Sequence, residues 1–168
     1  NKSIQNISII IDNDDKITSS NPVRLAIDEL HESLNQNGVK VSTYQTVDAA
    51  PADELIIIVA GSTNSLAQNI LKSNNVPVAD APESLVLIQG DISVKKVLLA
   101  SGSDYNGLMY AILELADRIQ CGIPPSEALT VAEPIIETPA LKIRSIYRTF
   151  TSDVTDKEWY NSKAFWRS

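Results

Sequence analysis

The sequence has almost none of the residues on which metal sites and nucleophilic sites are usually built. Among its 168 residues, Cys121 is the single cysteine and His31 the single histidine. One cysteine excludes an intrachain disulfide and a zinc site made of several thiolates, and one histidine excludes any site that requires two. We therefore expect no metal ion and no nucleophilic site built on these residues, and the sequence indicates no cofactor and marks no catalytic residue.

Long apolar runs and an excess of positive charge are also absent. The run at residues 55–60 is as long as any in the chain, far short of the about 20 residues of a membrane-spanning helix. The net charge is −7, whereas nucleic acids and anionic membranes are bound by clustered Lys and Arg. We expect neither a membrane span nor a nucleic-acid partner. No signal peptide is visible at Asn1, so the chain is either cytosolic or a mature or trimmed form.

Positive charge and aromatic residues are scarce in most of the chain and concentrated in its last part. Residues 1–141 contain 8 Lys and Arg against 18 Asp and Glu, whereas residues 142–168 contain 6 against 3. Six of the nine aromatic residues lie in the last 22 positions. This change of composition predicts a domain boundary near residue 140, with one domain over residues 1–139 and the opening strand and helix of another over residues 140–168.

The first 139 residues alternate short apolar runs with helical periodicity. Runs rich in β-branched residues predict strands at residues 7–12, 39–45, 55–60, 85–88 and 94–100, the last two joined by a turn around Gly90 and Asp91. Apolar stripes predict helices from Asn21 to Gly38, between residues 64 and 74, and between residue 104 and Gly122. The expected fold class is α/β (α+β), two layers in which helices pack on a mixed sheet of about five strands.

Two strand-to-helix loops, residues 61–65 and 101–107, are candidate ligand sites because a helix N-terminus can hold an anion. The second loop has the position of a phosphate loop, but Leu108 and Met109 stand where a Walker A loop requires Lys and then Ser or Thr. The other interpretation of both loops is a cluster of N-cap residues, with Gly107 and Ala111 allowing close packing of a helix on the sheet.

Other candidate residues favour structural interpretations. A calcium loop of the EF-hand type starting at Asp12 would require Gly and Glu where Ile17 and Val23 stand, so residues 12–15 are interpreted as an acidic, solvated turn. His31 lies off the apolar stripe of its helix and is interpreted as a surface histidine, and Cys121 as a small buried hydrophobic residue. None of the 21 acidic residues stands at a motif that marks a catalytic pair.

Arg144 and Arg148 lie on a strand predicted at residues 140–150. Their spacing of four places both side chains on one face of that strand. In a barrel strand this face could line the interior, where the two arginines would bind hydroxyls or a carboxylate of a substrate. The alternative is a pair of surface cations beside the acidic domain.

Residues 83–122 resemble the non-catalytic α/β domain that precedes the catalytic (β/α) barrel in several glycoside hydrolases, including family 20 β-N-acetylhexosaminidases and α-glucuronidases. The residues that carry the resemblance are Glu83, Asp104, Gly107 and Tyr110, with Ala111 in place of the usual second Gly. Residues 56–71 are similar to an earlier strand–Gly–helix segment of that domain. Residues 135–144 and 156–166 are similar to the linker and to the approach to the first barrel helix.

The resemblance implies a non-catalytic accessory domain that packs against the barrel of the same polypeptide, in a protein that hydrolyses glycosidic bonds of a glycan. It implies that Arg144 or Arg148 binds sugar in the intact barrel, although the flanking residues RSIYRTF depart from the family 20 pattern and leave the sugar open. It also implies export to a periplasm or outside the cell. The alternative is a free-standing α/β module that binds a small polar ligand at the loops of residues 61–65 and 101–107.

Overall fold

The computed structural model of the chain describes residues 4–78, 80–141, 159 and 162–166. Its strands are β1 (Asn6–Ile11), β2 (Lys40–Tyr44), β3 (Leu55–Gly61), β4 (Leu85–Ile92), β5 (Lys95–Gly102) and β6 (Ile135–Glu137). Its helices are α1 (Asn21–Gln36), the 3-10 helix η1 (Val47–Ala49), α2 (Ser65–Ser73), α3 (Tyr105–Gln120), α4 (Pro125–Ala128) and α6 (Lys163–Trp166).

The strands form one mixed sheet in the order β2-β1-β3-β5-β4-β6. Strands β2, β1, β3 and β5 run parallel, and β4 is antiparallel to both β5 and β6. The apolar run of β3 lies in the interior of this sheet, and its residues Ile56 to Ala60 are at most 2% exposed. Burial on both faces is typical of a strand with a continuous apolar sequence, and the predicted α/β class with a mixed sheet is confirmed.

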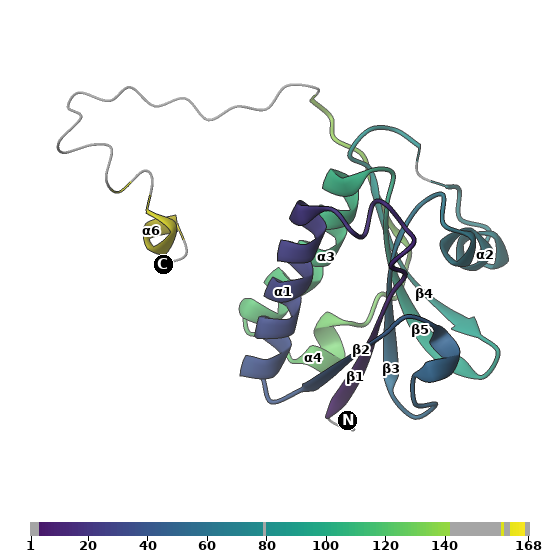
Figure 1. Ribbon diagram of the computed structural model, residues 1–168, viewed down its shortest axis with the longest axis horizontal. Coiled ribbons are helices and arrows are strands. Elements are labelled where there is room, and N and C mark those ends of the chain that lie inside the picture. Colours follow the sequence, from purple (N-terminus) through teal and green to yellow (C-terminus); the bar gives the residue numbers. More distant parts are fainter. Residues whose placement is uncertain (1–3, 79, 142–158, 160–161, 167–168) are drawn as a thin grey trace.

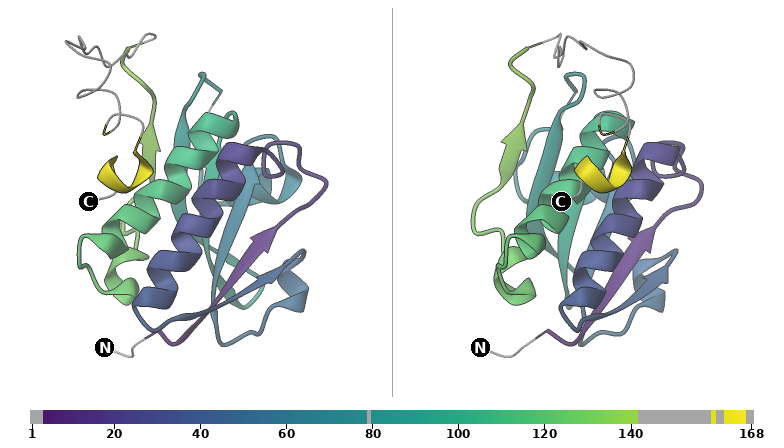
Figure 2. Two further views of the ribbon diagram at one scale, coloured as in Figure 1. Left: turned by 60° about the vertical axis from the view of Figure 1, so that its left-hand side comes forward. Right: turned by 90° about the vertical axis from the view of Figure 1, so that its left-hand side faces the viewer.

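Helices cover the sheet unequally on its two faces (Figure 1). Helices α1 and α3 lie side by side on one face, as the turned views of Figure 2 also show. Their predicted stripes point to the sheet and are buried there: Val23, Ile27, Leu30 and Leu34 of α1, and Leu108, Ile112, Leu115 and Ile119 of α3. Helix α2 and η1 contribute Ile70, Leu71 and Val47 to a second core on the other face. No helix in the described part of the chain is long and apolar enough to cross a membrane.

The hairpin between β4 and β5 differs from the prediction. Gly90 and Asp91 do not form its turn, because they pair with Val97 and Lys96 and extend the ladder. The chain reverses at Ser93 and Val94 instead; Ser93 adopts a left-handed conformation with φ of 55°, and Val94 is 87% exposed. Gly and Asp are common in turns, and for this reason Gly90 and Asp91 were predicted to form the turn. The register of the antiparallel pair instead places both residues within β4.

Cys121 was predicted to be buried, and this is wrong: its side chain is exposed. Helix α3 ends at Gln120, and Ile119 is the last residue of its stripe in the core. Cys121 is the C-cap that follows, and Gly122 turns the chain with φ of 84°. Two smaller differences are a sixth strand, β6, which was not predicted, and an N-cap of α1 at Ser20 rather than Asn21.

The first turn of α3 lies close to the loop before β4. A Cβ atom built on Gly107 would be 2.2 Å from the backbone oxygen of Ser84, so no larger residue fits without a shift of the backbone. Close packing of the helix on the sheet was predicted at Gly107; the close approach exists, but it is to Ser84 in the loop that leads into β4 rather than to a strand.

We expect Gly107→Ala to lower the free energy of unfolding by about 1–3 kcal/mol, because the added methyl group overlaps a backbone carbonyl that cannot move freely. Helix propensity alone predicts the opposite sign, a gain of about 1 kcal/mol. Urea unfolding of the variant measures the difference. Asp117→Ala, at an exposed position of the same helix, is the control and should leave stability nearly unchanged; a stabilised Gly107→Ala variant would contradict the close approach.

Candidate functional site

The carboxyl ends of β1, β3 and β5 meet at one edge of the sheet because the three strands are parallel. In open α/β sheets, ligands bind in the crevice outside these ends, at the point where the strand order reverses. Here the chain passes from β1 outward to β2 and then back across to β3. Both loops predicted as ligand sites lie at this edge, after β3 and after β5.

The loop after β1 reaches across this crevice and bonds to the loop after β3. Asp15 accepts a hydrogen bond from the backbone N–H of Gly61 at 2.7 Å, and Asp12 accepts one from the side-chain amide of Asn64 at 3.0 Å. The predicted solvated turn is therefore correct only for the exposed Asn13 and Asp14. Asp12 and Asp15 are partly buried and have structural partners 52 and 46 residues away in the sequence.

The loop at residues 61–65 contains the N-cap residue of α2, Asn64, as one of the two interpretations of this loop predicted. The side chain of Asn64 accepts a hydrogen bond from the backbone N–H of Leu66 at 2.9 Å. A cavity of about 290 Å³ adjoins the loop; Asp12, Asp48, Asn64 and Ser65 line its polar side, and Ile10 and Ile58 lie on its apolar side. Among the described residues, no group of three His, Cys, Asp or Glu side chains is placed to hold a metal ion.

The loop at residues 101–107 is held by the segment before β4. Asp104 accepts hydrogen bonds from the backbone N–H groups of Gly107 and Glu83, both at 2.9 Å. Ser103 donates from its hydroxyl to the carbonyl of Ala81 at 2.6 Å. This arrangement confirms the capped turn, and it gives three of the motif residues, Glu83, Asp104 and Gly107, a common structural role.

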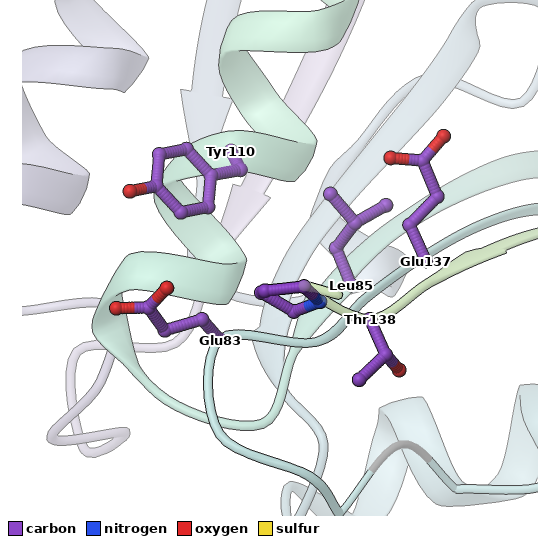
Figure 3. A pocket seen from close by; sticks show the side chains of 6 residues that line it. Glu83, Leu85, Tyr110, Glu137 and Thr138 are labelled. Carbon is purple, nitrogen blue, oxygen red and sulfur yellow. The ribbon is translucent and has the colours of Figure 1, made fainter. Parts of the chain in front are cut away.

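The fourth motif residue, Tyr110, lies at a cavity of about 240 Å³ where the chain leaves the sheet. Glu83, Leu85 and Glu137 also line this cavity, followed by Thr138 and Pro139. In Figure 3, Leu85 lies in the middle of the cavity lining; Glu83 and Tyr110 lie on one side of it, and Glu137 lies on the other side. The cavity therefore joins the motif residues to the predicted domain boundary. Sequence reasoning missed Glu137 because a three-residue strand carries too little pattern to be recognised.

Arg144 and Arg148, predicted to bind substrate in an intact barrel, lie outside the described residues. Their role remains a prediction.

His31 is half-buried rather than fully on the surface, because its face of α1 packs beside the edge strand β2. Its Nε2 atom is 3.5 Å from the hydroxyl of Thr43. Burial lowers the pKa of His31 below its usual value of 6.5, and the negative charge of Asp28 opposes this effect. The lowered pKa favours a neutral imidazole at pH 7.

Comparisons with known proteins find relatives in structure but not in sequence. No protein-family model matches the chain, and no curated protein matches its sequence. One similar solved structure is a GH138 enzyme targeting pectin rhamnogalacturonan II, with a TM-score of 0.51 and 15% identity over 80% of this chain and 15% of that chain. Another is CpGH84D, with a TM-score of 0.51 and 10% identity over 70% of this chain and 18% of that chain. The chain thus shares its fold with a part of each of these two proteins, and it spans less than a fifth of the length of either.

We expect Asp15→Ala to lower the free energy of unfolding by about 1–3 kcal/mol, because it leaves the backbone N–H of the buried Gly61 without its acceptor. Asp14→Ala, which removes the exposed carboxylate next to it, should change stability far less. Urea unfolding compares the two variants, and amide hydrogen exchange at Gly61 should accelerate only in Asp15→Ala. Equal effects of the two substitutions would show that the bond across the crevice contributes nothing.

The lowered pKa of His31 predicts a stability that falls with acidification. The unfolded chain takes up the imidazole proton at a higher pH than the folded chain, so this stabilising contribution is fully present above about pH 6.5 and is lost as the pH falls from there through the lower pKa of the folded chain. Urea unfolding between about pH 7.5 and pH 5.5 should show a steeper loss for the unaltered chain than for His31→Asn. Parallel pH profiles for the two proteins would contradict the shift.

Proposed function

We propose that residues 1–139 are a non-catalytic accessory domain of a glycoside hydrolase, and that residues 140–168 begin its catalytic (β/α) barrel. One observation supports the proposal above all. The region of structural similarity covers 80% of this chain but only 15% of the GH138 enzyme. A fold that forms a small part of larger glycoside hydrolases fits an accessory role better than an independent catalytic one.

The motif residues support an accessory domain of the kind found in family 20 β-N-acetylhexosaminidases and α-glucuronidases. Asp104 and Gly107 secure the start of α3 to the loop at Glu83. These are contacts that maintain a fold rather than contacts that position a substrate. The proposal therefore assigns the catalytic acid, base or nucleophile to the barrel, outside this chain.

The proposed partner of the domain is the barrel of the same polypeptide. The cavity lined by Glu83, Tyr110 and Glu137 lies where the chain passes into the proposed barrel segment. The excess of acidic residues in positions 1–141 and of basic residues in positions 142–168 makes the two parts complementary in charge. In the intact protein, Arg144 and Arg148 would bind the glycan substrate, and the protein would be exported.

One observation favours the alternative of a free-standing module that binds a small polar ligand. The cavity of about 290 Å³ beside Asn64 and Ser65 leaves space for such a ligand at the first predicted loop. The second loop offers fewer polar groups to a ligand, because the side chains of Ser103 and Asp104 both form hydrogen bonds with residues 81–84. Soaking the chain with sugars and anions would reveal a specific, saturable site beside Asn64 if the alternative holds.

We expect the 168-residue chain to lack turnover of aryl glycosides and a longer protein from the same reading frame to hydrolyse one or more of them. The test compares kcat/KM of both proteins on a panel of aryl glycosides. In the longer protein, Arg144→Gln or Arg148→Gln should reduce kcat/KM roughly tenfold or more if that side chain binds the sugar. Arg118→Gln, on α3 of the accessory domain, is the matched control and should have little effect. Turnover by the 168-residue chain, or a stop codon directly after Ser168, would overturn the proposal.

A further inference from the structure

A larger cavity, which we call the α1–β2 cavity, lies between α1 and the strands β1 and β2. It measures about 570 Å³, and its lining includes Asn13, Ser19, Arg24, Asp28, His31 and Thr43. This volume falls within the about 300–1,000 Å³ of small-molecule sites. Asn13 follows the carboxyl end of β1, and Thr43 lies near the carboxyl end of β2. The cavity therefore occupies the side of the sheet on which α/β folds bind ligands.

Three ionisable side chains reach the cavity from one face of α1. Arg24, Asp28 and His31 are spaced at i, i+4 and i+7, which aligns them along a helix. Within the described residues, the ion pairs are Lys96–Asp91 and Arg118–Glu114, so neither Arg24 nor Asp28 is neutralised by a salt bridge there. The guanidinium of Arg24 is thus a cation available to a ligand, and Asp28 is an available acceptor.

Neutral polar groups complete the lining. The imidazole of His31 is half-buried, and its Nε2 atom lies 3.5 Å from the hydroxyl of Thr43. A neutral imidazole can donate one hydrogen bond and accept another, and the hydroxyl of Thr43 and the amide of Asn13 can do both. This mixture suits the hydroxyl groups of a ligand, which also donate and accept.

The charges select among possible ligands. Arg24 offers a planar set of donors that matches a carboxylate. Asp28 lies one helical turn away and would repel a second negative charge, which disfavours an inorganic phosphate dianion. The same carboxylate can accept hydrogen bonds from ligand hydroxyls.

We propose that the α1–β2 cavity binds a hydroxylated monocarboxylate of monosaccharide size, with its carboxylate on Arg24 and its hydroxyls on Asp28, His31 and Thr43. The inference does not depend on the accessory role proposed above. It needs only the 168-residue chain, so failure of one proposal leaves the other standing.

The test is a titration of the 15N-labelled 168-residue chain with D-galacturonate, D-galactose and inorganic phosphate, followed by two-dimensional NMR. We expect saturable shifts with galacturonate, concentrated on residues 13–31 and on Thr43. Galactose and phosphate should each bind roughly tenfold more weakly or worse, because the first lacks the charged group and the second meets Asp28.

Arg24→Gln should weaken galacturonate binding roughly tenfold or more and leave the weak binding of galactose unchanged. Arg24 is exposed, so the variant should keep the thermal unfolding midpoint of the unaltered chain. Lys72→Gln, which removes an exposed cation from α2 on the other face of the sheet, is the matched control and should not alter binding. Equal affinity for galacturonate and galactose, tighter binding of phosphate, shifts confined to other surfaces, or unchanged binding by Arg24→Gln would each overturn the proposal.

Discussion

The position of α3 on the sheet depends on the contact between its first turn and the loop before β4. Gly107 permits the helix to approach the carbonyl of Ser84, and Asp104 bonds to Gly107 and Glu83 at the same time. The start of the helix is thereby fixed against the sheet. From this point α3 packs along α1 and β5, and Tyr110, one turn further on, reaches the cavity beside Glu137 at the predicted domain boundary.

A second constraint acts at the carboxyl edge of the sheet. The crevice between β1 and β3 is bridged by the bonds from Asp15 to Gly61 and from Asp12 to Asn64. A backbone N–H at such an edge often binds the anionic group of a ligand, and here a carboxylate of the chain itself takes that position. Open space remains to either side of the bridge, beside Asn64 and beside His31. The bridge fills the middle of the carboxyl edge between β1 and β3, so the two candidate ligand cavities lie on either side of it.

Features with a local cause could be predicted from the sequence, and features that depend on distant partners could not. The stripe from Leu108 to Ile119 and the buried run of β3 follow from periodicity within each segment, and both are confirmed. The turn at Ser93 depends on the pairing of two strands, and the bond of Asp15 to Gly61 joins residues 46 apart, so neither leaves a local pattern. For the same reason Asp12 and Asp15 looked solvated, and the half-buried setting of His31 was missed.

The sheet order separates the two places at which the chain is proposed to make external contacts. The α1–β2 cavity lies at the β2 edge, and the chain leaves toward the proposed barrel from the β6 edge. Five strand spacings of about 4.8 Å place these edges roughly 24 Å apart. That distance exceeds the Debye length of about 8 Å at physiological ionic strength, so charges at one edge are largely screened from the other. Charges where a barrel joins the β6 edge would therefore have little effect on the field at the exposed Arg24, and a ligand bound to Arg24 would remain compatible with an accessory role for the domain.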